Sequence, residues 1–360
     1  MTRLRPVAIA VSLLMFGGSA FAQLQLTPQT ADPLAKTGKP PDKPVKTKTI
    51  KPPLPKKEAA PPAKSAPAAA PDNKAEAPAP DNPNVDLVYG AYQRGMYKTA
   101  FDLATKRAQE NKDAAAMTML GELYANALGV KRDYGKAIEW YQRAVDLGDR
   151  EAMFALAMMR ISGRGGPTDS AAGAKLLASS AKLGEPKAAY NLALLYMDGQ
   201  TLPQDFKRAA ELLRFAADAG NPEAQYALAT FYKEGRGVEK NLYKSVRLLQ
   251  SASVAGNVDA EVEYAIALFN GTGTDKNEPA ALSLLRKAAR QNSAIAQNRL
   301  AHVLVYGMGA PVDKVNGLKW HIVAKTAGKG DLQLDEALAQ ATPEEREKAQ
   351  AAARKWLGIK

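Results

Sequence analysis

From residue 113 onward, small and hydrophobic residues recur along the chain with a period of 36 residues. One column of this repeat holds only alanine: Ala116, Ala152, Ala188, Ala224, Ala260 and Ala296. Four residues later, a second column holds the large side chains Leu120, Leu156, Leu192, Leu228, Tyr264 and Leu300. Six units keep this register over residues 113–328 without an insertion or deletion, which predicts six copies of one structural element.

The first part of each unit has the spacing of an amphipathic helix. Its small or apolar residues lie at positions i, i+4, i+5 and i+8, which share one helical face. In five units a glycine follows, where a residue of positive φ can end the helix: Gly163, Gly199, Gly235, Gly271 and Gly307. In the first unit Ala127 holds this place.

The second part of each unit predicts another helix. It opens at an Asp or Asn that can cap a helix: Asp133, Asp169, Asp205, Asn241, Asn277 and Asp313. Its buried face is expected at Trp140, Leu176, Leu212, Leu248, Leu284 and Trp320. Because a single helix pair would leave apolar faces uncovered, the sequence predicts an all-α solenoid of stacked antiparallel helix pairs.

Both ends of the repeated region have features of caps. Residues 86–112 predict a shortened N-terminal capping helix pair, and residues 329–360 predict C-terminal capping helices. The run Thr342-Pro343-Glu344-Glu345 has the pattern of a capping box with proline at the first helical position. Such ends keep the apolar face of the last unit away from water.

The repeated pattern resembles the Sel-one-like repeat (SLR), a relative of the tetratricopeptide repeat. It is clear in Ala188-x-x-x-Leu192-Ala-x-x-Tyr196-x-x-Gly199 and in the first unit's Leu120-Gly121 and Trp140-Tyr141. Departures from the pattern affect single turns and positions, at Ala127, Arg160, Asn292 and Gly317. The resemblance implies a superhelix of helix pairs. It also implies an adaptor role, because exported SLR proteins are often adaptors that restrain a membrane sensor kinase or engage host proteins.

Residues 1–22 have the three parts of a cleavable signal peptide. Two arginines precede an apolar run from Val7 to Phe16, and Ala20-Phe21-Ala22 then predicts cleavage after Ala22. An uncleaved anchor is the alternative, but the run is shorter than the ~20 residues that a membrane span needs. The mature protein is therefore expected to be periplasmic or secreted, with no transmembrane segment.

Residues 23–85 predict a disordered Pro/Lys/Ala-rich linker. This stretch holds 15 of the 23 prolines, ten lysines against six acids, and no aromatic residue. Such a composition cannot bury enough apolar surface to fold. The linker is either a passive spacer or a basic tether that contacts an anionic envelope polymer such as peptidoglycan. Nucleic acid is not expected as a partner of an exported chain.

Little in the sequence points to catalysis. The chain has no cysteine, which excludes disulfides, thiolate nucleophiles and zinc–thiolate sites. Its two histidines, His302 and His321, occupy repeat columns and are interpreted as packing substitutions. Ser179-Ser-Ala-Lys182 matches the S-x-x-K of penicillin-interacting serine enzymes, without their S-D-N or K-T-G elements. No metal, cofactor or catalytic residue is predicted; the alternative is a cell-wall-acting or β-lactamase-like hydrolase using Ser179 and Lys182.

The favoured hypothesis is a non-enzymatic scaffold or regulatory adaptor that binds a protein partner, such as a membrane sensor or envelope protein. Three columns of the first helix vary between units and share one face, which predicts a partner-binding groove. Its residues are Met119, Glu122, Asn126, Met158, Asn191, Leu194, Asp198, Thr230, Glu234, Glu263, Ile266, Arg299, His302 and Tyr306. The alternative is that these columns only face solvent. A second candidate is the aromatic column Phe154, Tyr190 and Tyr226, for which packing between helices is the alternative.

Overall fold

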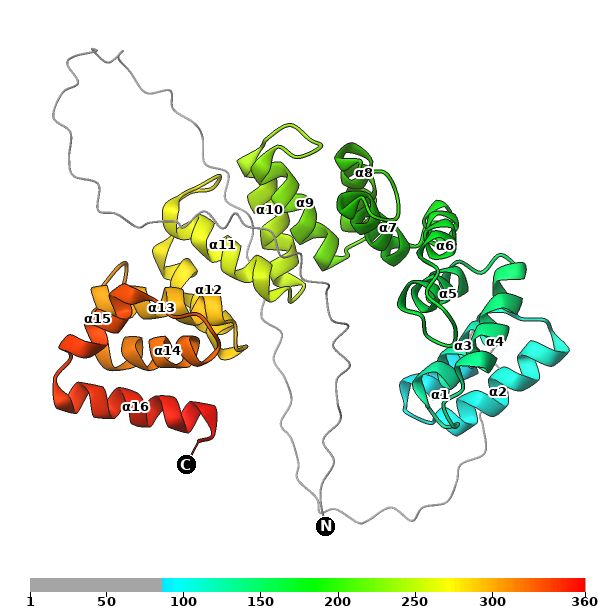
Figure 1. Ribbon diagram of the computed structural model, residues 1–360, viewed down its shortest axis with the longest axis horizontal. Coiled ribbons are helices and arrows are strands. Elements are labelled where there is room, and N and C mark those ends of the chain that lie inside the picture. Colours follow the sequence, from blue (N-terminus) through cyan, green and yellow to red (C-terminus); the bar gives the residue numbers. More distant parts are fainter. Residues whose placement is uncertain (1–85, 360) are drawn as a thin grey trace, which may run out of the picture. The chain divides into compact units, whose positions relative to one another are not determined.

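The computed structural model describes residues 86–359. This part of the chain contains sixteen α-helices and no strand (Figure 1). The predicted all-α solenoid is confirmed. The signal peptide and linker predicted for residues 1–85 lie outside the described residues. No helix of the described part is both long and apolar enough to cross a membrane.

Each of the six units consists of two helices of 13 residues. The first helices are α3 (Ala114–Asn126), α5 (Arg150–Ser162), α7 (Pro186–Asp198), α9 (Pro222–Glu234), α11 (Val258–Asn270) and α13 (Ala294–Tyr306). The second helices are α4 (Tyr134–Asp146), α6 (Ser170–Lys182), α8 (Phe206–Asp218), α10 (Leu242–Val254), α12 (Glu278–Arg290) and α14 (Lys314–Thr326). Before and after them lie α1 (Leu87–Gln93), α2 (Tyr97–Glu110), α15 (Leu332–Gln340) and α16 (Pro343–Leu357).

The ends of these helices follow from the residues that flank them. The Asp133 carboxylate caps α4 by accepting a hydrogen bond from the Lys136 backbone N–H at 3.0 Å. Glycines in the left-handed conformation end the first helices of five units, whereas Ala127 ends α3 with a φ of 57°. In the next turn a side chain at Gly237 would place its Cβ 2.2 Å from the Phe206 carbonyl oxygen. The turn can therefore lie this close to α8 only with glycine there.

The core runs through the units in chain order. Each first helix packs against its own second helix, and each second helix packs against the next first helix. The alanine column is buried in every unit, which lets the helix backbones approach closely, and leucines such as Leu120, Leu156 and Leu300 fill the remaining space. Full burial of a leucine contributes about 2 kcal/mol. Stability is therefore spread along the stack rather than concentrated in one centre.

The C-terminal helices close the stack. Helix α16 packs along α14, where the Trp320 and Trp356 rings meet edge to face with centroids 5.0 Å apart. The Lys319 ammonium lies over both rings, 4.2 Å and 4.8 Å from their centroids. Thr342 and Glu345 form a capping box at the start of α16. The shorter α15 contacts both α13 and α14.

Candidate partner-binding face

The residues predicted to line a groove all lie on the first helices. We call the accessible side chains of α3, α5, α7, α9, α11 and α13 the first-helix face. Asn126, Glu234 and Tyr306 are exposed on it, and His302 is buried. The others are half-buried: Met119, Glu122, Met158, Asn191, Leu194, Asp198, Thr230, Glu263, Ile266 and Arg299. The structure therefore brings the predicted residues onto one set of neighbouring helices.

At the N-terminal end of this face, polar groups of α3 are satisfied by contacts with α1 and with the cap of α5. The Tyr92 hydroxyl on α1 donates to Glu122 Oε1 on α3 at 3.1 Å. Burial and the Glu122 carboxylate raise the pKa of Tyr92 to about 12. The Thr118 hydroxyl similarly reaches the Asp149 carboxylate, which caps α5, at 3.0 Å. These contacts occupy the Glu122 carboxylate and the Thr118 hydroxyl, whereas Asn126 stays exposed.

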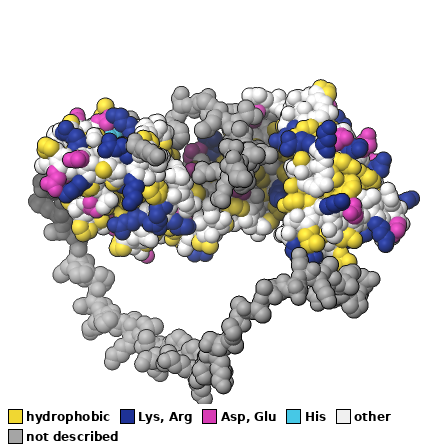
Figure 2. Space-filling view, turned by 90° about the horizontal axis from the view of Figure 1, so that it is seen from below, with side chains coloured by type: hydrophobic (Ala, Val, Ile, Leu, Met, Phe, Trp, Pro, Cys, Tyr) yellow, Lys and Arg dark blue, Asp and Glu magenta, His cyan; other side chains and the backbone are white. Residues whose placement is uncertain are grey.

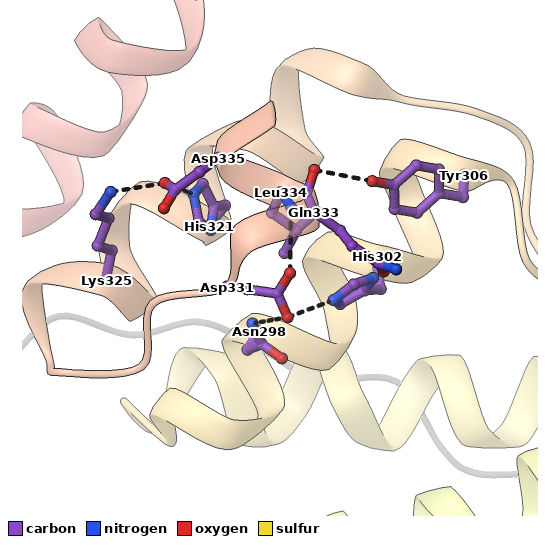
Figure 3. A network of polar contacts seen from close by, with 9 residues as sticks. All are labelled: Asn298, His302, Tyr306, His321, Lys325, Asp331, Gln333, Leu334 and Asp335. Carbon is purple, nitrogen blue, oxygen red and sulfur yellow. Dashed lines mark hydrogen bonds and ion pairs between the residues drawn. The ribbon is translucent and has the colours of Figure 1, made fainter. Parts of the chain in front are cut away.

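At the C-terminal end, α15 covers the face (Figure 3). His302 Nε2 lies 2.9 Å from Asp331 Oδ2, and the Tyr306 hydroxyl donates to the Gln333 carbonyl at 3.1 Å. Although burial opposes it, hydrogen bonds from His302 and from the Leu334 backbone hold the pKa of Asp331 below its ordinary value. His302 therefore joins two helices and is not accessible on the face.

His321 makes the matching contact from α14 (Figure 3). Its ring is fully buried, and Nε2 lies 2.8 Å from Asp335 Oδ1 on α15. Lys325 donates to the same oxygen at 2.6 Å. Hydrogen bonds from Lys325 and His321 lower the pKa of Asp335. Both histidines hold α15 in place, as expected of packing substitutions, and the described residues contain no group of three or more metal-ligating side chains.

Ser179 and Lys182 lie one turn apart on the exposed side of α6. The Ser179 hydroxyl donates to the Lys175 carbonyl at 3.1 Å, the usual bond of a serine within a helix. Within the described residues nothing holds the Lys182 amine against this hydroxyl. The geometry therefore provides no activated nucleophile of the kind that the hydrolase alternative requires.

The middle of the repeat region is divided by charge. Helices α7, α9 and α11 together carry six acidic and two basic side chains. Their partners α8, α10 and α12 carry eight basic and three acidic side chains. Glu261 is fully buried, so the first-helix face carries five acidic and two basic side chains in the third to fifth units, although residues 86–360 have a net charge of +6. The repeat columns do not reveal this division, because it appears only when charge is summed over each helix.

Elsewhere the surface is mixed. Figure 2 shows Lys and Arg side chains over both the N-terminal and the C-terminal helices, with hydrophobic side chains gathered over the N-terminal ones. A cavity of about 350 Å³ opens between α8, α9 and α10, and its lining includes Lys207, Glu211, Arg214, Tyr232 and Lys244. Charges of both signs line this cavity, so it does not favour a ligand of one sign. The acidic section of the first-helix face is the more distinctive feature.

Two tyrosines lie within this acidic section. Tyr190 and Tyr226 are half-buried, with their rings packed against the hydrophobic core. Burial and the nearby Glu263 and Asp259 carboxylates raise the pKa of Tyr226 to about 12. Burial and Glu223 likewise raise the pKa of Tyr190. The aromatic column therefore packs between helices, and two of its members also lie close to carboxylates on the next first helix.

The repeated units match a known protein family. A family model described as "Sel1 repeat" matches residues 114–149, 150–185, 186–221, 222–257, 258–293 and 294–329. These ranges begin and end one residue later than the units predicted over residues 113–328. Among curated proteins, none matches the chain.

Solved structures with the same fold are also found. A Sel1 repeat protein from Oxalobacter formigenes is 23% identical with a TM-score of 0.57, covering 66% of this chain and 94% of its own. A protective antigen of uropathogenic Escherichia coli strains, displaying an SLR fold, is 25% identical with a TM-score of 0.52. That match covers 73% of this chain and 64% of the antigen. These likenesses agree with the family match on the fold.

Proposed function

Because the chain belongs to the Sel1 repeat family, we propose that it is a non-enzymatic scaffold or regulatory adaptor that binds a partner protein on its first-helix face. Sel1 repeat proteins generally act as scaffolds for protein interactions. The observation that carries the proposal is the contrast between two sets of residues on the same helices. The alanine and leucine columns are buried and nearly invariant, whereas the half-exposed columns differ from unit to unit.

This contrast supports binding because packing alone explains only the buried columns. The column of the half-exposed Leu194 and Thr230 also holds Glu122 and His302, so its chemistry changes from unit to unit. Repeat proteins present such positions side by side on consecutive helices, which gives a partner several contacts at once. The typical non-enzymatic role of the family agrees with the ordinary helix contact made by Ser179.

We further propose that this scaffold acts in the periplasm or after secretion, with a membrane sensor or envelope protein as its partner. Support comes from the basic start, apolar run and Ala20-Phe21-Ala22 of residues 1–22. N-terminal sequencing of protein recovered from cell fractions tests this location. A periplasmic or extracellular chain that begins at Gln23 is expected, and a cytoplasmic chain that retains residues 1–22 would contradict it.

Cross-linking in living cells tests the binding face. A photoreactive residue at position 194 or 230 lies on α7 or α9, and one at position 247 lies exposed on α10 as a control. We expect one protein to be trapped from positions 194 and 230 and not from position 247. Trapping from position 247 alone would move the binding surface to the second helices and overturn the proposal.

A further inference from the structure

The cavity between α8, α9 and α10 has a lining that the repeat does not require. Its volume of about 350 Å³ lies at the lower end of the range for small-ligand sites, roughly 300–1,000 Å³. Lys207 of α8 lines it, and no other unit has a charged residue in this column, which otherwise holds Gly135, Ala171, Tyr243, Pro279 and Val315. Stacking of the units therefore does not explain the charge at this position.

Tyr232 is the deeply buried polar member of the lining, with 8% of its surface exposed. Its hydroxyl oxygen accepts a hydrogen bond from Arg214 Nη2 at 3.3 Å, and Lys244 Nζ lies 5.4 Å from the centre of its ring. The hydroxyl hydrogen has no acceptor among the described residues. Buried tyrosine hydroxyls usually find a partner, so this hydrogen is free to donate to a ligand in the cavity.

The charged side chains of the cavity do not neutralise one another. Lys207 and Glu211 lie one turn apart on α8, and Glu239 lies in the turn before α10. Neither these three side chains nor Arg214 and Lys244 form an ion pair within residues 86–359. The cavity therefore offers both positive and negative groups to a ligand.

We propose that this cavity binds a small zwitterion, either a free amino acid or a short peptide. The Arg214 guanidinium and the Tyr232 hydroxyl would donate to its carboxylate, as neighbouring donors do in charge-assisted pairs. Glu211 and Glu239 would accept from its ammonium. An ion of one sign would leave the groups of the other sign unmatched. The proposal goes beyond the binding of a partner protein and does not depend on it.

Peptides that lack one charge provide the probe. Ala-Ala carries both charges, acetyl-Ala-Ala lacks the ammonium, and Ala-Ala amide lacks the carboxylate. Isothermal titration calorimetry with the full chain at about 0.05 M salt keeps screening low. We expect Ala-Ala to bind, and the other two peptides to bind about tenfold more weakly, because each loses a charge-assisted contact. Alanine in the same titration shows whether a single residue is sufficient.

Two substitutions in one column locate the site. Arg214→Gln removes the guanidinium, and the fold accepts glutamine here because the first and fourth units have it in this column. Arg286→Gln is the matched control, since Arg286 is exposed in the same column of α12 and Leu304 stands where Tyr232 would be. We expect about tenfold weaker binding of Ala-Ala for Arg214→Gln and no change for Arg286→Gln.

A third substitution tests the ammonium end of the ligand. Glu211→Gln should weaken the binding of Ala-Ala and leave that of acetyl-Ala-Ala unchanged, because this peptide has no ammonium to lose a partner. For the same reason Arg214→Gln should leave the binding of Ala-Ala amide unchanged. Circular dichroism of each variant confirms that helix content is retained.

Several outcomes would overturn the inference. Equal binding of all three peptides would show that charge does not select the ligand, and so would equal weakening by Arg214→Gln and Arg286→Gln. Inorganic phosphate that binds as tightly as Ala-Ala would indicate a simple anion site instead. The absence of any binding heat with Ala-Ala or alanine up to about 10 mM would show that the cavity holds only solvent.

Discussion

Among single residues, Glu261 is the most unusual member of its column. In the units on either side, Gln225 and Gln297 donate from Nε2 to backbone carbonyls of the preceding second helix at 3.1 Å. A carboxylate cannot make this contact. Glu261 is fully buried, its Oε1 has no partner among the described residues, and its Oε2 accepts from the Lys287 ammonium at 2.7 Å. Lys287 is therefore the group that makes a buried charge tolerable at this position.

The first prediction concerns this ion pair. Lys287→Met should lower the free energy of unfolding by about 3 kcal/mol, because it leaves a buried carboxylate without its cation. In the double variant Glu261→Gln/Lys287→Met most of the loss should return, since the amide can donate as Gln225 and Gln297 do. Urea unfolding followed by circular dichroism measures both. A double variant as unstable as Lys287→Met would show that the charge is not the cause.

Tyr226 gives a prediction on pH. Its pKa is about 12 in the folded protein and about 10 in an unfolded chain, so folding favours the neutral hydroxyl. The stability that this preference contributes is fully present below pH ~10 and is lost as the pH rises through ~12. Tyr226→Phe should therefore lose less stability than the parent protein between these pH values. An unchanged alkaline unfolding curve would show that neither burial nor the Glu263 and Asp259 carboxylates raise the pKa of this hydroxyl.

At the scale of elements, helix α15 depends on few contacts. Leu334 is its only buried residue; Ala337 and Leu338 are partly buried against the core, and Arg346 of α16 donates to the Leu338 and Ala339 carbonyls. Asp331, Gln333 and Asp335 add polar bonds to α13 and α14. An element held in this way can open without unfolding its neighbours. Together these contacts keep the end of the first-helix face covered.

Truncating the Leu334 side chain tests how α15 is held. Leu334→Ala should weaken the packing of α15 by about 2–4 kcal/mol. A nine-residue helix is not stable enough by itself to make up this loss. We expect faster hydrogen exchange for the amides of residues 332–340, with little change in α3 to α11. If exchange accelerates equally throughout the repeats, α15 is part of the main cooperative unit instead.

The sequence predicted the repeated elements well because each unit encodes its own helix limits. Gly163 and Asp169 end one helix and cap the next, and the same columns recur in the other units. The contacts across the first-helix face could not be predicted in this way. Whether Tyr226 lies near Asp259, or His302 near Asp331, depends on how neighbouring first helices are aligned. A column pattern gives the position of a residue within its unit and not its neighbour in the next.

The charge division between first and second helices was present in the sequence in principle. To detect it, each residue must be assigned to a helix, and the charges of α7, α9 and α11 must be added separately from those of α8, α10 and α12. Its absence from the end units, where α13 has a single Arg299 and no acid, makes it a local property. Packing accounts for part of it, because the buried Glu261 of α11 pairs with Lys287 of α12.

At the scale of the whole molecule, stability should follow the number of stacked units. Each second helix contacts its own first helix and the next one, so a complete unit of 36 residues can be removed without changing the kind of contact at the new junction. Deleting residues 222–257 joins α8 directly to α11. The buried alanine of α11 then takes the place of the buried alanine of α9.

We predict that this shortened protein remains soluble and helical and unfolds cooperatively, at a lower urea concentration than the parent. Deleting residues 222–239 is the control, because it removes α9 alone and brings two second helices together. That change leaves the apolar faces of α8 and α10 without the helix that covers them, so aggregation or loss of the cooperative transition is expected. Circular dichroism during urea titration measures both proteins. If the shorter deletion were tolerated as well as the longer one, the first helix would not be the element that couples neighbouring units.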